Sequence, residues 1–203
     1  FQDNDGFIWL TTRTGLYRYF GDGSNDFDAV YEGDIFYDIC QDADGLMWIR
    51  RRGGLIIYDP RTRSFTDETE TARILDSERW IDRFTIDRWD NWWWCEQGSI
   101  YYRTRAEQVK THVGEVNGTV VDICCRNGMT YVLTDIGELY RYSLDTEVGP
   151  VALRVLSPLE EPASAEQSFS RVFVDSQNNI WLSQGAHGVW LYRFGSEIPL
   201  HLR

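Results

Sequence analysis

The sequence predicts an all-β protein, a β-propeller of about five four-stranded blades. A repeat of about 40–50 residues recurs along the chain, and each copy holds several short strand-like segments separated by turn residues. That period, with several strands per unit, is typical of propellers. The central strand of each copy is apolar on both faces, as expected when neighbouring blades cover each sheet from two sides. This favours a propeller over a β-sandwich or barrel, which are the alternatives.

Five copies of the repeat cover the chain. The pattern is Asp, two residues, Gly or another turn residue, one residue, and then an aromatic anchor between two apolar residues. The copies read "DNDGFIWLTTRTGLYRY" (3–19), "DADGLMWIRRRGGLIIYDP" (42–60), "DRWDNWWWCEQGSIYYR" (87–103), "CRNGMTYVLTDIGELYRY" (125–142) and "DSQNNIWLSQGAHGVWLYRF" (175–194). Their anchors, spaced 38 to 50 residues apart, are Trp9, Trp48, Trp93, Tyr131 and Trp181.

Each copy contains four expected strands. The first precedes the Asp turn, in which Asp accepts hydrogen bonds from nearby backbone amides and Gly supplies positive φ. The Trp strand follows, and the next Gly marks a hairpin into a third strand. A variable fourth strand is expected at 63–68 and 151–156, and the only short helix candidate spans 77–84. Residues 21–34, 66–78 and 157–168 are interpreted as loops between blades, so that residues 1–203 form a single propeller domain or fragment.

Three consecutive tryptophans, Trp92, Trp93 and Trp94, stand at the anchor position of the third copy. A strand sends alternate side chains to opposite faces, so Trp92 and Trp94 share a face and Trp93 takes the other. Trp93 aligns with the anchors, whereas its two neighbours replace aliphatic residues. We therefore expect a core strand whose enlarged flanking side chains pack against the next blade, rather than a sugar-stacking platform.

Composition excludes some classes of function. The formal net charge of −12 argues against nucleic acid as a partner, because nucleic-acid binding needs a basic surface. No apolar run approaches the roughly 18–20 residues of a membrane span. The chain begins at Phe1, apparently within a strand motif, and we interpret it as a piece of a longer protein.

The four cysteines show neither a CxxC pair nor a histidine at ligand spacing, so we expect no metal site and no cofactor. They are Cys40, Cys95, Cys124 and Cys125. Their apolar contexts indicate buried free thiols. A disulfide between Cys40 or Cys95 and one of the adjacent pair stays open.

The motif "D-x-x-G-x-I-W-L-x-T…G-L-Y-R-Y" resembles the two-component regulator propeller repeat of periplasmic sensor regions in bacterial hybrid two-component systems, especially those of gut Bacteroidetes. The likeness is strong in copies one, two and five, and weak in copy four, where Tyr131 replaces Trp and Cys125 replaces Asp. It implies a periplasmic sensor module that binds oligosaccharides, with any histidine kinase outside this segment. Family members carry more repeats than five, so a partial array is implied. Neighbouring blades or domains of the same protein, and a homodimer, are the expected protein partners.

The hairpin after each Trp strand is where the copies diverge, and these turns cluster on one face of a propeller. Loops that differ between the copies of a regular scaffold commonly carry the residues that determine ligand specificity. The "RRR" run (50–52) suits carboxylates or sulfates, because Arg grips them bidentately. Its alternative is solvated charge or pairing with acids of a neighbouring blade. The predicted ligand-binding residues of the hairpins are Arg13, Arg51, Arg52, Gln97, Asp135 and His187. Trp80, in a loop between blades, is added because an exposed Trp ring can stack on a sugar face, with packing against the protein as its alternative.

No convergent catalytic set is visible in the sequence, so we predict no catalytic residues in this segment. The three histidines, His112, His187 and His201, are scattered, and no Gly-x-Ser-x-Gly elbow occurs. The recurrent aspartates are explained as turn residues; they are Asp3, Asp42, Asp87 and Asp175. A polysaccharide lyase or glycoside hydrolase on a propeller, and a protein-interaction scaffold, are the alternative functions.

Overall fold

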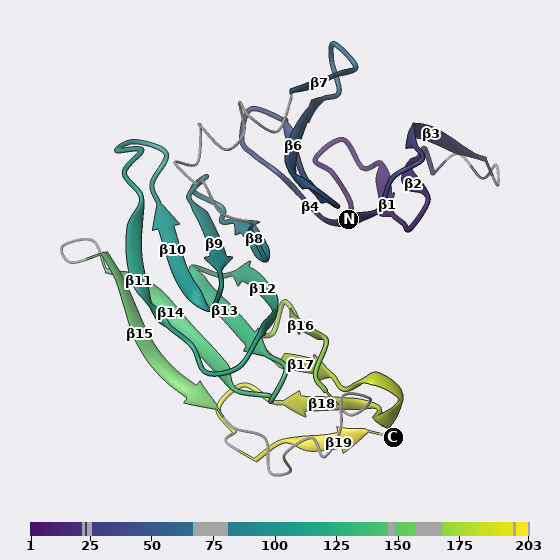
Figure 1. The fold of residues 1–203 in the computed structure, drawn as a ribbon. Coiled ribbons are helices and arrows are strands. Elements are labelled where there is room, and N and C mark those ends of the chain that lie inside the picture. Colours follow the sequence, from purple (N-terminus) through teal and green to yellow (C-terminus); the bar gives the residue numbers. More distant parts are fainter. Residues whose placement is uncertain are drawn as a thin grey trace. The chain divides into compact units, whose positions relative to one another are not determined.

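The computed structural model describes residues 1–21, 23, 26–66, 81–145, 149–156, 168–196 and 198–202. These residues form five antiparallel sheets, one per repeat, and a single-turn 3-10 helix, Gly185–His187 (Figure 1). The predicted all-β propeller architecture is confirmed. The chain divides into two compact units, 1–81 and 82–203. We number the sheets blade 1 to blade 5 in chain order and describe each unit by itself.

The first unit holds blades 1 and 2. Blade 1 has three strands in the order β1 (Ile8–Thr11), β2 (Gly15–Tyr19) and β3 (Phe27–Glu32). Blade 2 has four, β4 (Phe36–Gln41), β5 (Met47–Arg51), β6 (Gly54–Asp59) and β7 (Ser64–Thr66). In both blades the aromatic anchor lies on the strand that follows the Asp turn.

The second unit holds blades 3, 4 and 5, each with four strands. Blade 3 comprises β8 (Arg83–Ile86), β9 (Trp92–Glu96), β10 (Ser99–Arg103) and β11 (Thr111–Glu115). Blade 4 comprises β12 (Val120–Arg126), β13 (Met129–Thr134), β14 (Leu139–Asp145) and β15 (Gly149–Leu156). Blade 5 comprises β16 (Arg171–Val174), β17 (Ile180–Ser183), β18 (Val189–Tyr192) and β19 (Leu200–Leu202). Every sheet follows chain order, so each is a simple meander.

Three details of the predicted strand pattern were wrong. Residues 21–34, expected to be a loop, contain β3, which pairs antiparallel with β2. Blade 1 therefore shows three strands among the described residues rather than four. The helix candidate 77–84 ends inside β8, and its first four residues lie outside the described part of the chain. His112, expected between repeats, lies in β11.

The Asp turn has the predicted chemistry, and blade 2 shows it fully. Oδ1 of Asp42 accepts the backbone N–H of Asp44 at 3.0 Å and that of Leu46 at 2.8 Å. Oδ2 accepts the indole N–H of Trp48 at 2.8 Å. Gly45 supplies the turn's positive φ of 83°. One buried carboxylate therefore closes the turn and also fixes the anchor side chain.

Blades 1 and 5 repeat this arrangement with Asp3–Trp9 at 2.7 Å and Asp175–Trp181 at 3.1 Å. Blade 3 departs from it. Oδ2 of Asp87 accepts the side-chain amide of Asn91 at 3.0 Å, and the buried indole nitrogen of Trp93 has no hydrogen-bond partner among the described residues. The shared turn is thus compatible with two ways of using the second carboxylate oxygen.

The anchors pack toward the following blade within each unit. Trp9 joins a buried cluster with blade 2, where its ring meets Tyr58 edge-on at 5.7 Å. Trp93 joins a cluster with β12 to β14, where its ring centroid lies 6.1 Å from that of Tyr142. Tyr131 replaces Trp in blade 4 and packs in the cluster shared with blade 5. The core of each unit therefore lies between successive sheets.

All three tryptophans of β9 are buried, with exposed fractions of 8% for Trp92, 1% for Trp93 and 0% for Trp94. Burial confirms the core interpretation of this strand. The expected partner of the flanking pair was wrong: Trp93, not Trp92 or Trp94, belongs to the cluster with blade 4. Trp94 instead stacks on Tyr101 of β10, with ring centroids 5.7 Å apart.

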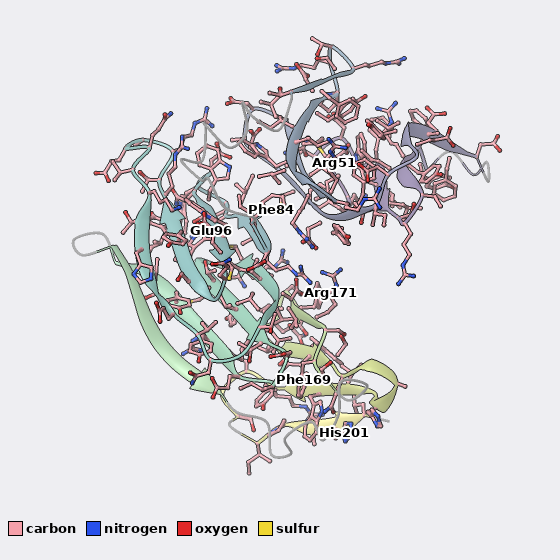
Figure 2. The ribbon with its side chains drawn as sticks, in the orientation of Figure 1. Arg51, Phe84, Glu96, Phe169, Arg171 and His201 are labelled. Carbon is pink, nitrogen blue, oxygen red and sulfur yellow. The ribbon has the colours of Figure 1, made fainter. Side chains whose placement is uncertain are left out.

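Polar links also join successive blades of the second unit. The Asp122 carboxylate of blade 4 accepts the backbone N–H of Val172 at 2.8 Å and pairs with Arg171 of blade 5 at 3.3 Å (Figure 2). Arg83 of blade 3 donates through Nε to the carbonyl of Val121. These contacts fix the register of neighbouring sheets, because each joins a first strand to the next first strand.

Blade 5 carries a row of apolar side chains on the face turned away from blade 4. Phe173, Trp181, Leu191 and Leu200 are paired successively across its four strands, and paired residues lie on one face of a sheet. Phe173 is 63% exposed and Leu200 42% exposed. This row occupies the anchor side of the blade, the side that packs against the following sheet in blades 1, 3 and 4.

The four cysteines are free thiols, as the apolar contexts predicted. Cys95 is buried in the cluster between blades 3 and 4. Among the described residues no helix is long and apolar enough to cross a membrane.

Candidate functional site

The predicted ligand-binding residues of the first unit lie on the turns that lead out of β1 and β5. Arg51 forms an ion pair with Asp34, and Arg52 lies 3.8 Å from the same carboxyl group. Burial acts to raise the pKa of Asp34, but the Ile35 amide and the two guanidinium groups outweigh it and leave that pKa lowered. Arg13 is exposed.

The arginine run is therefore largely internal to blade 2. Arg50 is buried and pairs with Asp38 at 2.7 Å across β4 and β5. Its guanidinium also lies over the ring of Tyr37, 4.4 Å from the centroid. Both of these paired acids belong to the first strand of the same blade or to its lead-in. Arg52 is the member of the run whose side chain is mostly exposed.

In the second unit, the predicted residues also lie on second-to-third-strand turns. Gln97 has a φ of 53°, and its backbone N–H donates to Asp82 at 2.7 Å. Oδ1 of Asp135 accepts the N–H groups of Thr119 and Ile136 at 2.8 and 3.0 Å, which gives this carboxylate a turn-forming role. His187 is exposed in the single-turn helix. Trp80 lies outside the described residues, so its predicted role stays a prediction, as do the roles of the others.

A buried ion pair stands beside the Gln97 turn. Glu96, labelled in Figure 2, accepts the Trp94 indole N–H at 2.6 Å and the Lys110 ammonium at 3.0 Å. The Lys110 ammonium also lies over the Tyr101 ring, 4.2 Å from its centroid. These contacts give Glu96 a structural role, because they hold β9, β10 and the segment before β11 together.

A pocket of about 400 Å³ opens between blades 4 and 5, at the end of the sheets opposite the hairpin turns. It brings together none of the residues predicted for ligand binding. Its lining combines four ionisable side chains, two amides, a hydroxyl and apolar surface, from Asn127, Met129, Tyr131, Arg141, Asn178, Ile180, Tyr192, Arg193, Phe194, Gly195 and Ser196. All of these belong to the second unit.

The two asparagines of the pocket occupy equivalent turns. Asn127 and Asn178 have φ values of 50° and 65°, a left-handed conformation that Asn tolerates better than most residues. The Asn127 side-chain amide donates to the Asn178 side-chain oxygen and so joins the turns of blades 4 and 5. The first-to-second-strand turns thereby form one wall of the pocket.

Two buried donors of the pocket have no hydrogen-bond partner among the described residues. They are Nε of Arg141, on β14, and the hydroxyl of Tyr192, on β18. Burial raises the pKa of Tyr192 and of Tyr131, although Arg141 acts to lower the latter. Both phenols are neutral at physiological pH and can donate. Both atoms are themselves buried, so neither faces the open part of the pocket.

The mouth of the pocket is formed by the turn after β18. The backbone N–H of Phe194 donates to Oδ1 of Asn179 at 2.9 Å, and that of Ser196 to the carbonyl of Arg193 at 2.9 Å. These bonds hold the turn while leaving the Phe194 ring 74% exposed. An exposed aromatic ring beside polar donors suits a ligand with an apolar sugar face.

One signal in the sequence could have indicated this pocket. The third strand reads "LYRY" in the first and fourth copies, which places Arg18 and Arg141 in otherwise apolar strands. Each faces the anchor aromatic in register, Trp9 or Tyr131. The Arg18 guanidinium lies over the Phe7, Trp9 and Phe20 rings and pairs with Asp28 at 3.8 Å. Arg141 lines the pocket between blades 4 and 5.

Among the described residues, no group of three or more His, Cys, Asp or Glu side chains is arranged to hold a metal ion. No protein-family description and no curated protein matches this chain in sequence.

Solved structures share the fold. The extracellular domain of the putative hybrid two component system BT4673 from B. thetaiotaomicron is 19% identical, with a TM-score of 0.65 over 100% of this chain and 30% of its own length. The corresponding domain of BT3049, also from B. thetaiotaomicron, is 16% identical, with a TM-score of 0.69 over 100% of this chain and 28% of that one. A fungal alcohol oxidase of the AA5 family in complex with copper is 11% identical, with a TM-score of 0.64 over 99% and 52%. The chain thus spans about a third or less of the two sensor domains it resembles.

Proposed function

We propose that this chain is part of the ligand-sensing propeller of a membrane-bound hybrid two-component regulator. Its ligand is an oligosaccharide, bound outside the cytoplasm. Binding shifts a conformational equilibrium that the parent protein reads, and no bond of the ligand is broken. Neighbouring blades or domains of the parent protein, and a second copy, are its proposed protein partners.

The observation that carries the proposal is the pocket between blades 4 and 5. Its volume of about 400 Å³ lies within the range of small-molecule sites, about 300–1,000 Å³. Asn, Tyr, Arg and Ser side chains are well suited to sugar hydroxyls, because they supply donors and acceptors on converging strands. The likeness of the fold to extracellular domains of hybrid two-component systems supports a sensor role.

The hairpin turns of each unit, taken by itself, hold further candidate binding residues. Arg13 and Arg52 of the first unit and His187 of the second have exposed side chains, whereas Arg51 and Asp135 are engaged with Asp34 and Thr119. Arg13→Gln tests the turns of the first unit separately from the pocket, because Arg13 lies in that unit.

The test is calorimetric titration of the purified chain with a panel of neutral and acidic oligosaccharides, followed by mass spectrometry of the recovered ligand. Saturable binding with intact ligand supports the sensor role. Recovery of cleaved or oxidised ligand would show instead that the chain is an enzyme. This alternative follows from its similarity in fold to the AA5 oxidase. A panel without binding, together with a stable protein partner, would favour a scaffold.

A further inference from the structure

We propose that the pocket between blades 4 and 5 selects an acidic saccharide, with Arg141 as the residue that binds its carboxylate. The inference rests on the proposed function and names the chemical class of the ligand. Uronic-acid oligosaccharides are the class that fits, since they carry both hydroxyl groups and a carboxylate on each ring.

The first argument is charge. The protein as a whole carries a formal net charge of −12, yet the ionisable side chains that line this pocket are two arginines and two tyrosines. Arg141 and Arg193 therefore place two positive charges in a region of an otherwise acidic chain. A local positive site in a low-dielectric setting attracts an anion more strongly than exposed charge does.

The second argument is the missing carboxylate partner. Among the described residues no carboxylate pairs with Arg141, which lines the pocket. A carboxylate satisfies guanidinium donors in parallel pairs. Arg18, at the equivalent position of blade 1, lies 3.8 Å from the Asp28 carboxylate, and its Nε is buried without a hydrogen-bond partner just as that of Arg141 is, so the carboxylate is what distinguishes the two arginines. For Arg141 the pocket offers that place to a ligand.

The third argument concerns the rest of the lining. Tyr192 lines the pocket but is only 3% exposed, and its hydroxyl is buried, so it shapes the wall rather than donating to the ligand. Because burial raises the pKa of this phenol, it stays neutral and adds no negative charge against an anion. Phe194 at the mouth offers a ring face, and Arg193 is exposed beside it. Together these groups recognise a charged sugar rather than a bare inorganic anion.

The test uses digalacturonate and its dimethyl ester, two ligands with the same hydroxyl groups, of which only the first is charged. We expect calorimetry to show binding of the acid at least about tenfold tighter than of the ester. Arg141→Gln should reduce affinity for the acid by about tenfold or more and bring the two ligands close together. Tyr192→Phe should leave the preference for the acid unchanged, because the buried hydroxyl does not face the ligand. Arg61→Gln makes the same charge change on an exposed residue of blade 2, and should leave binding within about twofold.

The outcomes separate this inference from the proposed function. Equal affinity for acid and ester, or binding that ignores Arg141→Gln, would overturn the acidic-ligand assignment while leaving a saccharide sensor in place. If no saccharide binds but the plain dicarboxylate adipate binds in an Arg141-dependent manner, the sensor role fails and the anion site stands. Circular dichroism of each variant, compared with the parent chain, establishes that a loss of binding is not a loss of fold.

Discussion

At the scale of single residues, the repeated aspartate is the group on which the turn of blades 1, 2, 3 and 5 depends. Its first oxygen accepts two backbone amides, and its second accepts an indole N–H in blades 1, 2 and 5. Trp93 lacks that bond although it is buried as deeply as Trp9. Comparing Trp9 with Trp93 therefore separates the contribution of indole packing to stability from that of the indole hydrogen bond.

We expect Trp9→Phe to destabilise the chain more than Trp93→Phe, by about 1–2 kcal/mol, because only the first leaves a buried carboxylate oxygen without its donor. Both changes remove similar ring area, so that contribution approximately cancels. Urea unfolding followed by circular dichroism measures the difference. Equal losses would show that the Asp3–Trp9 bond contributes little beyond packing.

Asp175 gives the turn a dependence on pH. The indole of Trp181, then the Asn179 amide and the turn's backbone N–H groups, lower its pKa to about 2. The unfolded carboxyl titrates near 3.9, so its contribution to stability is full above about pH 4 and is lost as pH falls toward 2. Asp175→Asn should flatten the fall in thermal midpoint between pH 4.5 and 2.5. Asp5→Asn, at an exposed site, serves as the control. An unchanged slope in Asp175→Asn would contradict the assignment.

At the scale of elements, β9 and β10 are held by a buried ion pair as well as by apolar packing. Lys110→Met should destabilise the chain by about 2–4 kcal/mol at neutral pH, because it removes the ammonium partner of the buried Glu96 carboxylate. Denaturant unfolding is the measurement. Adding Glu96→Gln to Lys110→Met should recover part of the loss. Failure of the double variant to recover any stability would assign the Lys110 effect to its packing over Tyr101.

The strands that sequence analysis predicted are those with a marked apolar pattern. The Trp strands, which are apolar on both faces, and the short apolar strands before each Asp turn are of this kind. β3, with the sequence FDAVYE, was missed because its residues are exposed or only partly buried and do not alternate regularly between apolar and polar, while its pairing with β2 uses backbone groups that leave no pattern in the sequence.

The pocket was missed for a different reason. Its residues come from two repeats and meet only through packing of blade 4 on blade 5, so no single motif contains it. The hairpin residues were predicted as a group because they share a repeat position. Their partners, such as Asp34 for Arg51 and Thr119 for Asp135, became visible only in three dimensions. The sequence therefore located the scaffold, whereas the pocket depends on three-dimensional packing and the roles predicted for the hairpin residues stay predictions.

At the scale of the whole molecule, the cysteines give a simple measure of the folded core. Burial raises the pKa of Cys95 to about 12, so its reactive thiolate is scarce at neutral pH. We expect Ellman's reagent to leave Cys95 unmodified in the native chain, and to titrate four thiols after denaturation in guanidinium. Two thiols in the denatured chain would instead reveal a disulfide, and rapid native modification at Cys95 would show that the blade 3 and 4 cluster opens readily.

The orientation of the anchor aromatics gives the stack of sheets a polarity. Trp9, Trp93 and Tyr131 each pack toward the following sheet within their unit, so blades 1, 3 and 4 present an anchor face to the next blade, which meets it with a face of different composition. The anchor face of blade 5 carries Phe173 and Leu200, which are 63% and 42% exposed. Two anchor faces related by a two-fold axis would set aromatic against aromatic. A contact that repeats the one between successive blades is therefore heterologous, because it joins unlike faces head to tail.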